Sequence, residues 1–365
     1  MSLKLIVPRD PLIFRDGKPF TAVPGERAKS IPFPYPATVA GAVRTRKGTT
    51  FSKTEIEELK NISIRGPFLV ELGNDKVHWY FPAPADALQM SATEIHSLAP
   101  IEFDNGSSDL ENGLKLIGAK KNIVEKPMKD APLYWNWELI QAWLMNPDDE
   151  LDFSKATRGP VSETRTHVSI DKDSQTALSG ALFQTSGFEF IKKNGKLSDT
   201  TQFALAIETT ETLDDSVDTL GGERRVVYWQ NSTEPLPVCD EKIKTQIKNG
   251  KHCRLMLATP AFFENGYIPK HLEETYNLEI VAVALPRYQT ISGWDYEKGA
   301  PKPTRRLVPA GAVYFIKFKD AGKIEDFLAK WLHSICEKDS QDQRDGFGIA
   351  LLGAWNGVLR KYGGA

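Results

Sequence analysis

Apolar and polar positions alternate along residues 161–190, which predicts a hairpin of two long strands. One face of its first strand carries Thr164, Thr166, Val168 and Ile170. The opposite face carries Arg165, His167, Ser169 and Asp171. Turn-forming residues at 171–174 separate this strand from a second apolar run that ends at Phe190. Two interpretations stay open: a solvated sheet edge, which the stretch alone favours, and a strand that presents cations to an anionic ligand.

The first part of the chain begins with a strand pattern over residues 3–7 and a helical pattern over 37–46. Gly41 inside this helix costs about 1 kcal/mol relative to Ala, and we attribute it to close packing against a sheet. Strands are expected over 62–72 and 77–81. Capping residues then predict helices that begin at Thr54, Ser91 and Asn136.

The second half shows a more regular pattern. Strands are expected over residues 252–259, 279–286, 311–318 and 347–355. Helices are expected over 269–276 and 323–337, and the second has the best helical spacing of apolar residues in the chain. The order is β-α-β-β-α-β, which is typical of a ferredoxin-like unit.

The first half begins with the same order, so the pattern predicts an α+β fold of two tandem ferredoxin-like (RRM-like, βαββαβ) domains with insertions. A chain of 365 residues is long enough for two cores. We expect one domain over 1–215, with an insertion around 82–157 and the hairpin at 161–190. The second domain is expected over 216–365, with a long loop at 287–309.

Composition favours a globular cytoplasmic protein. No apolar run reaches the length of a membrane span, and the first residues lack a signal-peptide profile. The cysteines are dispersed, which suits a reducing compartment; they are Cys239, Cys253 and Cys336. The net charge of −2 argues against a free-standing nucleic-acid binder. Cations nevertheless cluster locally at residues 44–47, 224–225 and 302–306, a weak indication of a polyanion-binding face.

Motifs for catalysis, metals and cofactors are missing from the sequence. No G-x-S-x-G or P-loop motif is present, and Gly346-x-Gly348 precedes a predicted strand, whereas a dinucleotide fingerprint opens a helix. The six histidines have no metal-ligand spacing. His167 is the only histidine that we consider for acid–base chemistry, and a structural role is favoured for it. We therefore expect no catalytic residue, metal or cofactor.

Two further segments suit RNA. In Leu220–Tyr228, two glycines precede two arginines, which indicates either a tight turn or a close approach of the backbone to a ligand, with equal weight. The loop 287–309 interleaves Tyr288, Trp294 and Tyr296 with lysines and arginines. Single-stranded RNA is held by cations and by stacked aromatics, at roughly 1–3 kcal/mol per stacked base.

Motifs along the chain resemble those of the RAMP superfamily. Within that superfamily they resemble the third subunits of the Cmr complex, which is the type III-B CRISPR effector. The resemblance covers nearly the whole chain and rests on Pro8–Phe20, Pro32–Thr45, Glu163–Asp171, Gly180–Phe190, Leu220–Val226, Ile291–Asp295, Pro301–Gly311 and Gly346–Gly353. It implies two ferredoxin-like domains and no catalysis. It also implies that the chain caps the 5′ handle of the crRNA. The implied protein partners are the large polymerase-like subunit and the first backbone RAMP subunit.

The resemblance implies RNA contacts at Arg165, His167, Arg224, Arg225, Gly346 and Gly348. Arg305 and Arg306 are weaker candidates, because their loop could equally face a protein. Two alternatives stay open. One is a metal-independent endoribonuclease that processes repeat RNA, since relatives that cleave crRNA precursors use a histidine; that histidine cannot be mapped here. The other is an adaptor that binds only proteins.

Overall fold

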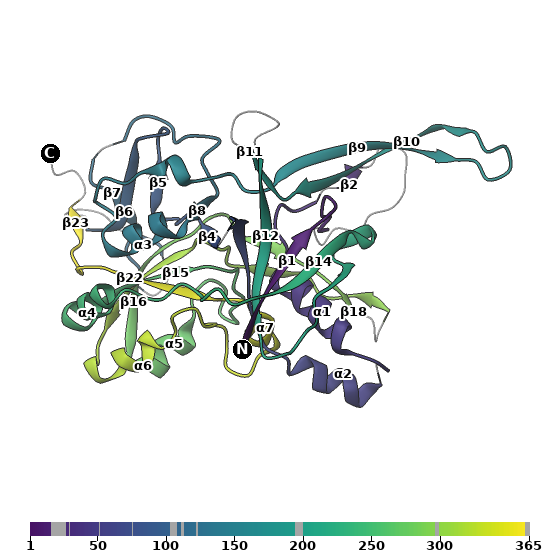
Figure 1. The fold of residues 1–365 in the computed structure, drawn as a ribbon. Helices are drawn as coiled ribbons and strands as arrows, with labels where there is room; N and C mark the ends of the chain where they lie inside the picture. The colour runs from purple at the N-terminus through teal and green to yellow at the C-terminus, as the bar shows by residue number, and fades with distance from the viewer. Residues whose placement is uncertain are drawn as a thin grey trace.

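The computed structural model describes residues 1–15, 27–28, 30–50, 52–74, 76–102, 108–110, 113–121, 123–193, 200–295 and 299–361. They form a mixed α+β structure with two main antiparallel sheets, an inserted subdomain and a two-stranded arm that projects away from the rest (Figure 1). No helix within these ranges is long and apolar enough to cross a membrane.

The first sheet has the strand order β13-β14-β1-β12-β3-β4-β8, with β11 also paired to β12. Its strands are β1 Ser2–Pro8, β3 Ile64–Leu72, β4 Val77–Pro82, β8 Tyr134–Asn136, β11 Ile191–Lys193, β12 Thr200–Thr209, β13 Ser216–Thr219 and β14 Val226–Ser232. The strand predicted over 3–7 is therefore central, between β12 and β14. The boundary expected after residue 215 falls before β13 and β14, and both strands pair within this first sheet.

Two helices accompany this sheet, α1 Pro36–Lys47 and α2 Lys53–Lys60. Our explanation of Gly41 is wrong: this residue is exposed on α1, and a Cβ added there would meet no atom within 4 Å. The cap predicted at Thr54 is also wrong. Ser52 caps α2 by accepting a hydrogen bond from Glu55 N at 3.2 Å, and the Glu55 carboxylate in turn accepts from the amide of Thr49 at 2.7 Å.

The segment between β4 and β9 (Val161–Ile170), where an insertion was expected around residues 82–157, contains a small sheet and a helix. Its elements are β5 Ala87–Gln89, β6 Ile95–Glu102, β7 Ile117–Ala119, α3 Trp137–Met145 and η2 Phe153–Lys155. Asn136 caps α3 as predicted, by accepting from Leu139 N at 3.2 Å. The helix predicted at Ser91 is wrong. The Ser91 hydroxyl accepts from Glu94 N at 3.0 Å within the turn that joins β5 to β6, so a local capping signal stabilises a turn there.

The arm is the predicted hairpin, built from β9 Val161–Ile170 and β10 Ala177–Glu189, with β2 Arg27–Ala28 beside β10. Figure 1 shows it extending well beyond the sheets. Val168 pairs with Leu182 on one face, and both side chains are exposed. His167 pairs with Phe183 on the other face. The alternation in the sequence therefore correctly predicted which residues share a face.

The second sheet has the order β16-β21-β15-β22 and is antiparallel throughout. Its strands are β15 His252–Leu257, β16 Leu278–Ala284, β21 Val313–Phe318 and β22 Ala350–Ala354, close to the four predicted strands. The accompanying helices are α4 Glu241–Gly250, α5 Lys270–Tyr276, α6 Ile324–Leu328 and α7 Gln341–Asp345, with η4 at Ala321–Lys323. Helix α4 was not predicted, although Asp240 caps it by accepting a hydrogen bond from Lys242 N at 2.8 Å.

The long helix predicted over 323–337 is wrong, because α6 ends at Leu328. The chain beyond it runs along the start of β22: Leu332 N donates to Ala350 O at 2.7 Å, and Ile335 N donates to Gly348 O at 2.8 Å. Leu332 adopts a positive φ of 51°, which no helix tolerates. The apolar side chains of this segment are still buried, so burial alone produced the helical spacing.

The loop predicted over 287–309 forms two small ribbons. One pairs β17 Gln289–Ile291 with β20 Arg305–Leu307, and the other pairs β18 Trp294–Asp295 with β19 Ala300–Pro301. The Tyr35 hydroxyl, just before α1, donates to Thr290 O at 3.3 Å, so this loop lies beside the start of α1. Tyr296 and residues 16–20 of the Pro8–Phe20 motif lie outside the described residues.

The insertion and the second sheet are joined by a buried ion pair. Arg254 on β15 contacts the Asp86 carboxylate at 2.8 Å, and their side chains are only 3% and 1% exposed. The other carboxylate oxygen accepts from Trp143 Nε1 at 2.9 Å. Arg254 also donates to the carbonyls of Trp143 and Ala354. Elsewhere at this junction, β23 Arg360–Lys361 pairs with β6. One continuous apolar core spans both sheets and α3.

Candidate nucleic-acid interface

The glycine-arginine turn at 220–225 packs on the chain's own backbone. Gly221 has φ +78°, and a Cβ there would lie 2.5 Å from Ile13 O. Gly222 N donates to the same carbonyl at 2.7 Å. The close approach that the two glycines allow is therefore to residue 13, and it fixes the turn against the segment that follows β1.

The tip of this turn, η3 Gly222–Arg224, contains two consecutive non-glycine residues in the left-handed region, Glu223 at φ 58° and Arg224 at φ 49°. Such conformations cost roughly 1–3 kcal/mol each and concentrate at functional sites. They leave Arg224 exposed. Arg225 is only 16% exposed and forms an ion pair with Glu223 at 2.7 Å.

The same segment that supports the turn also supports the base of the arm. Leu12 and Phe188 exchange two backbone hydrogen bonds, of 2.9 and 2.8 Å. Asp10 accepts a hydrogen bond from Val226 N at 3.0 Å, which fastens residues 9–10 to the start of β14. Three stretches far apart in sequence, 9–13, 186–189 and 221–226, are thus held together, and we name this place the arm base.

Charges of both signs meet at the arm base. Arg165 is 46% exposed and contacts Glu163 at 2.8 Å, and this hydrogen bond raises the pKa of the guanidinium. Burial, with Glu163 and Asp10 adding repulsion, raises the pKa of Glu189. Arg9, exposed and 5.8 Å from the ring of Tyr228, belongs here as well. Arg9 is not among the predicted site residues, although it lies in the Pro8–Phe20 motif.

The side chain of His167, on β9, packs against the neighbouring strand β10 of the arm. Its ring stacks on Phe183 with centroids 5.2 Å apart and planes at 18°. Its Nε2 lies 2.9 Å from the Thr185 hydroxyl, within hydrogen-bond distance. These contacts account for a histidine at this position by cross-strand packing.

Arg305 and Arg306 differ in their surroundings. Arg305 forms two bonds with the Asp342 carboxylate, of 2.7 and 2.9 Å, and this pairing raises the pKa of the guanidinium. It therefore fastens β20 to α7. Arg306 is exposed and lies 5.0 Å from the centre of the Tyr288 ring. Arg306 is the more exposed of the two, whereas the Arg305 side chain is 37% exposed and already paired with Asp342.

The two late glycines are buried. Gly346 has φ +94°, and a Cβ there would lie 2.5 Å from Gly66 O on β3. Gly348 has φ +68°, and a Cβ there would lie 2.8 Å from Cys336 Sγ. Gly346 therefore packs between the two sheets, and Gly348 packs against Cys336, which explains glycine at both positions. Neither residue presents its backbone on the surface. Among the described residues, no group of three or more His, Cys, Asp or Glu could hold a metal ion.

The family model of the CRISPR-associated protein (Cas_Cmr3) matches residues 4–355, almost the entire sequence. The chain belongs to the Cas_Cmr3 family. This confirms the part of the resemblance that concerns the Cmr family. The match spans the arm base, the arm and the loop at 287–309, so the site described above lies within the family's common region.

The chain is similar in fold to chains in solved structures of the type III-B Cmr-beta. One is the cryo-EM structure of the type III-B Cmr-beta bound to cognate target RNA and AMPPnP, state 1, with 16% identity, a TM-score of 0.52 and coverage of 94% of each chain. Another is the type III-B Cmr-beta bound to cognate target RNA, with 14% identity, a TM-score of 0.52 and coverage of 96% of each chain. These similarities establish a shared fold. No curated protein matches this Cas_Cmr3 family member.

Proposed function

We propose that this chain is a non-catalytic crRNA-binding subunit of a type III-B CRISPR effector complex. It caps the 5′ handle of the crRNA in the cytoplasm and docks the large polymerase-like subunit and a backbone RAMP subunit. Membership in the Cas_Cmr3 family supports the proposal. The similar solved chains, which come from Cmr-beta bound to cognate target RNA, support it as well.

The strand orders support membership in the RAMP superfamily with two ferredoxin-like domains. In the second sheet, the order β22-β15-β21-β16 places the fourth, first, third and second strands of the unit side by side. The order β14-β1-β12-β3 in the first sheet repeats this arrangement. There β12 is the third strand of the unit, and β13 with the 220–225 turn occupies the connection where a second helix would lie.

The observation that carries the proposal is the arm base. Arg9 and Arg224 are exposed on two of the three stretches that hydrogen bonds hold together there, and Arg165 is exposed on β9, opposite Thr185. Phosphate oxygens bind guanidinium more strongly than a neutral acceptor does. Glu163 and Glu223 each hold an arginine in place through an ion pair, and an incoming phosphate can replace the carboxylate at the same guanidinium.

The test is binding of handle RNA to the purified full-length chain carrying Arg224→Ala and Arg225→Ala. We expect the Kd to rise roughly 100-fold or more, since each of the two hydrogen bonds to a charged group contributes about 1.5–3 kcal/mol. The slope of log K against log salt should fall by about 1.4, at about 0.7 for each phosphate that the protein no longer neutralises. The RNA should be recovered uncleaved with and without EDTA.

The matched control is Lys242→Ala with Lys248→Ala on α4, which Figure 1 places at the far end of the molecule from the arm. Both lysines are exposed, so this control removes the same charge. Equal RNA affinity in the two double variants would contradict the proposed RNA site. Specific cleavage that disappears in His167→Ala would show an endoribonuclease instead. An assembled complex that yields no RNA crosslink on this chain would favour the protein-only adaptor.

A further inference from the structure

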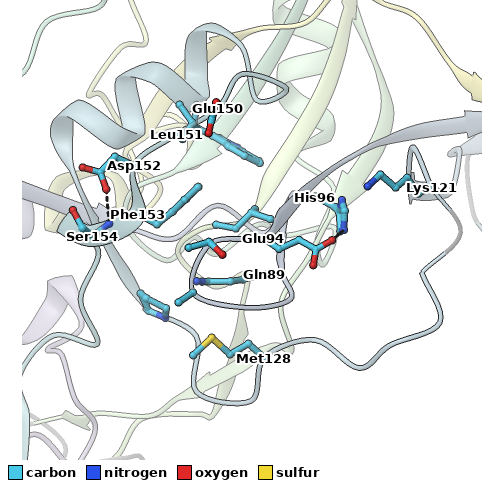
Figure 2. A pocket seen from close by; sticks show the side chains of 15 residues that line it. Gln89, Glu94, His96, Lys121, Met128, Glu150, Leu151, Asp152, Phe153 and Ser154 are labelled. Atoms are coloured by element: carbon cyan, nitrogen blue, oxygen red, sulfur yellow. Dashed lines mark hydrogen bonds and ion pairs between the residues drawn. The ribbon is translucent and has the colours of Figure 1, made fainter.

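The inserted subdomain contains a cavity of about 730 Å³ between β5, β6 and the segment around η2 (Figure 2). This volume lies within the range of sites that bury a ligand or a peptide side chain. The apolar part of its wall comes from Met128, Trp143, Leu151 and Phe153. Such a wall favours an aliphatic or aromatic group over a fully hydrated one.

The polar part of the same wall is mainly acidic. It includes the carboxylates of Glu94, Glu150 and Asp152 against the single lysine Lys121. A hydrogen bond from Ser154 lowers the pKa of Asp152, so this carboxylate stays ionised at neutral pH. His96 lies 3.0 Å from Glu94 through its Nε2 and so faces a carboxylate already. The charge is opposite to that required for RNA, because a polyanion is repelled by carboxylates.

The segment that forms one wall of the cavity also carries an exposed apolar side chain. The segment that contributes Lys121 and Met128 to the cavity also carries Val124, which is 90% exposed. Leu116 and Leu133, on either side in sequence, are exposed too.

We propose that this cavity is the docking site for a basic segment of a protein partner. An arginine or lysine of the partner enters it, with its aliphatic stem on Met128 and Phe153 and its charge beside Glu150 and Asp152. The inference rests on the proposed membership in a multi-subunit complex. It assigns protein binding to the insertion and leaves RNA binding at the arm base.

The experiment uses the full-length chain and two labelled peptides, Ac-Gly-Arg-Leu-Arg-Gly-NH2 and its counterpart with Glu in place of Arg. Fluorescence polarisation should show saturable binding of the basic peptide alone. The pocket variant, Glu150→Gln with Asp152→Asn, should weaken it at least fivefold. Asn preserves the cap that Asp152 provides to Ser154 N, so the local fold is retained. The control is Glu274→Gln on α5, an exposed acid, and it should leave the affinity unchanged.

A photoreactive benzophenone side chain at position 128 provides a second measurement in the assembled complex. We expect an adduct with a protein peptide that contains Arg or Lys, and its yield should fall in the pocket variant. The inference is overturned by equal binding of the two peptides, by no saturable binding, or by an RNA adduct at position 128. A handle-RNA affinity that is normal in the pocket variant, together with loss of the peptide, separates this site from the arm base.

Discussion

Replacing Asp86 by asparagine should destabilise the protein by about 3–5 kcal/mol, the range for removing one partner of a buried ion pair. The side chain of Arg254 would remain only 3% exposed with its charge uncompensated. Its remaining partners would be the carbonyls of Trp143 and Ala354. The amide oxygen of the introduced asparagine could still accept from Trp143 Nε1, so the measured loss isolates the charge interaction.

The companion variant is Arg254→Met, which removes the guanidinium while filling most of its space. If the reasoning holds, the variant with both changes is less destabilised than the sum of the two single variants by about 2 kcal/mol, because no buried charge remains. Urea unfolding of the four proteins, followed by circular dichroism, measures this directly.

An exposed pair serves as the control for the same measurement. Glu325 contacts Lys248 at 2.6 Å, and both side chains are largely in solvent. Glu325→Gln should change the free energy of unfolding by at most about 1 kcal/mol. The reasoning is refuted if Asp86→Asn costs no more than this control, or if the two buried changes are simply additive.

Two further predictions concern packing. Gly346→Ala should cost at least about 2 kcal/mol in unfolding free energy, from the positive φ and the close approach to Gly66 O. Gly41→Ala on exposed α1 should instead stabilise by about 0.5–1 kcal/mol. Burial raises the pKa of the thiols of Cys239, Cys253 and Cys336, and for Cys239 and Cys336 the pKa rises to about 12. Because the thiolate is the reactive form, Ellman's reagent at pH 8 should label no thiol in the native state and all three in urea. Rapid labelling without denaturant would contradict the described core.

Local signals in the sequence were sufficient for much of the fold. The alternation over 161–170 predicted the arm and its faces, because a hairpin depends mainly on neighbouring residues. Asn136 predicted the start of α3 for the same reason. The helix predicted after Leu328 was wrong because the apolar residues of this segment are buried by pairing with β22. The spacing of apolar residues does not reveal a partner strand that follows later in the chain.

The candidate site shows the same limit. Arg305 looked like a free cation, yet its partner Asp342 lies 37 residues away in sequence. Gly346 looked like a backbone approach to RNA, whereas the atom it approaches is Gly66 O of another sheet. The turn at 221–225 was predicted as either tight or ligand-facing. Only the fold shows that its glycines meet Ile13 while Arg224 stays exposed.

The central place of β1 has a consequence for synthesis on the ribosome. This strand is made about 200 residues before both of its neighbours, β12 and β14. At about 5–20 residues per second, β1 waits roughly 10–40 s for its partners. During that time its apolar side chains and unpaired edges are open to other nascent chains. The first sheet therefore cannot be completed around β1 until Ser232 has emerged from the ribosome.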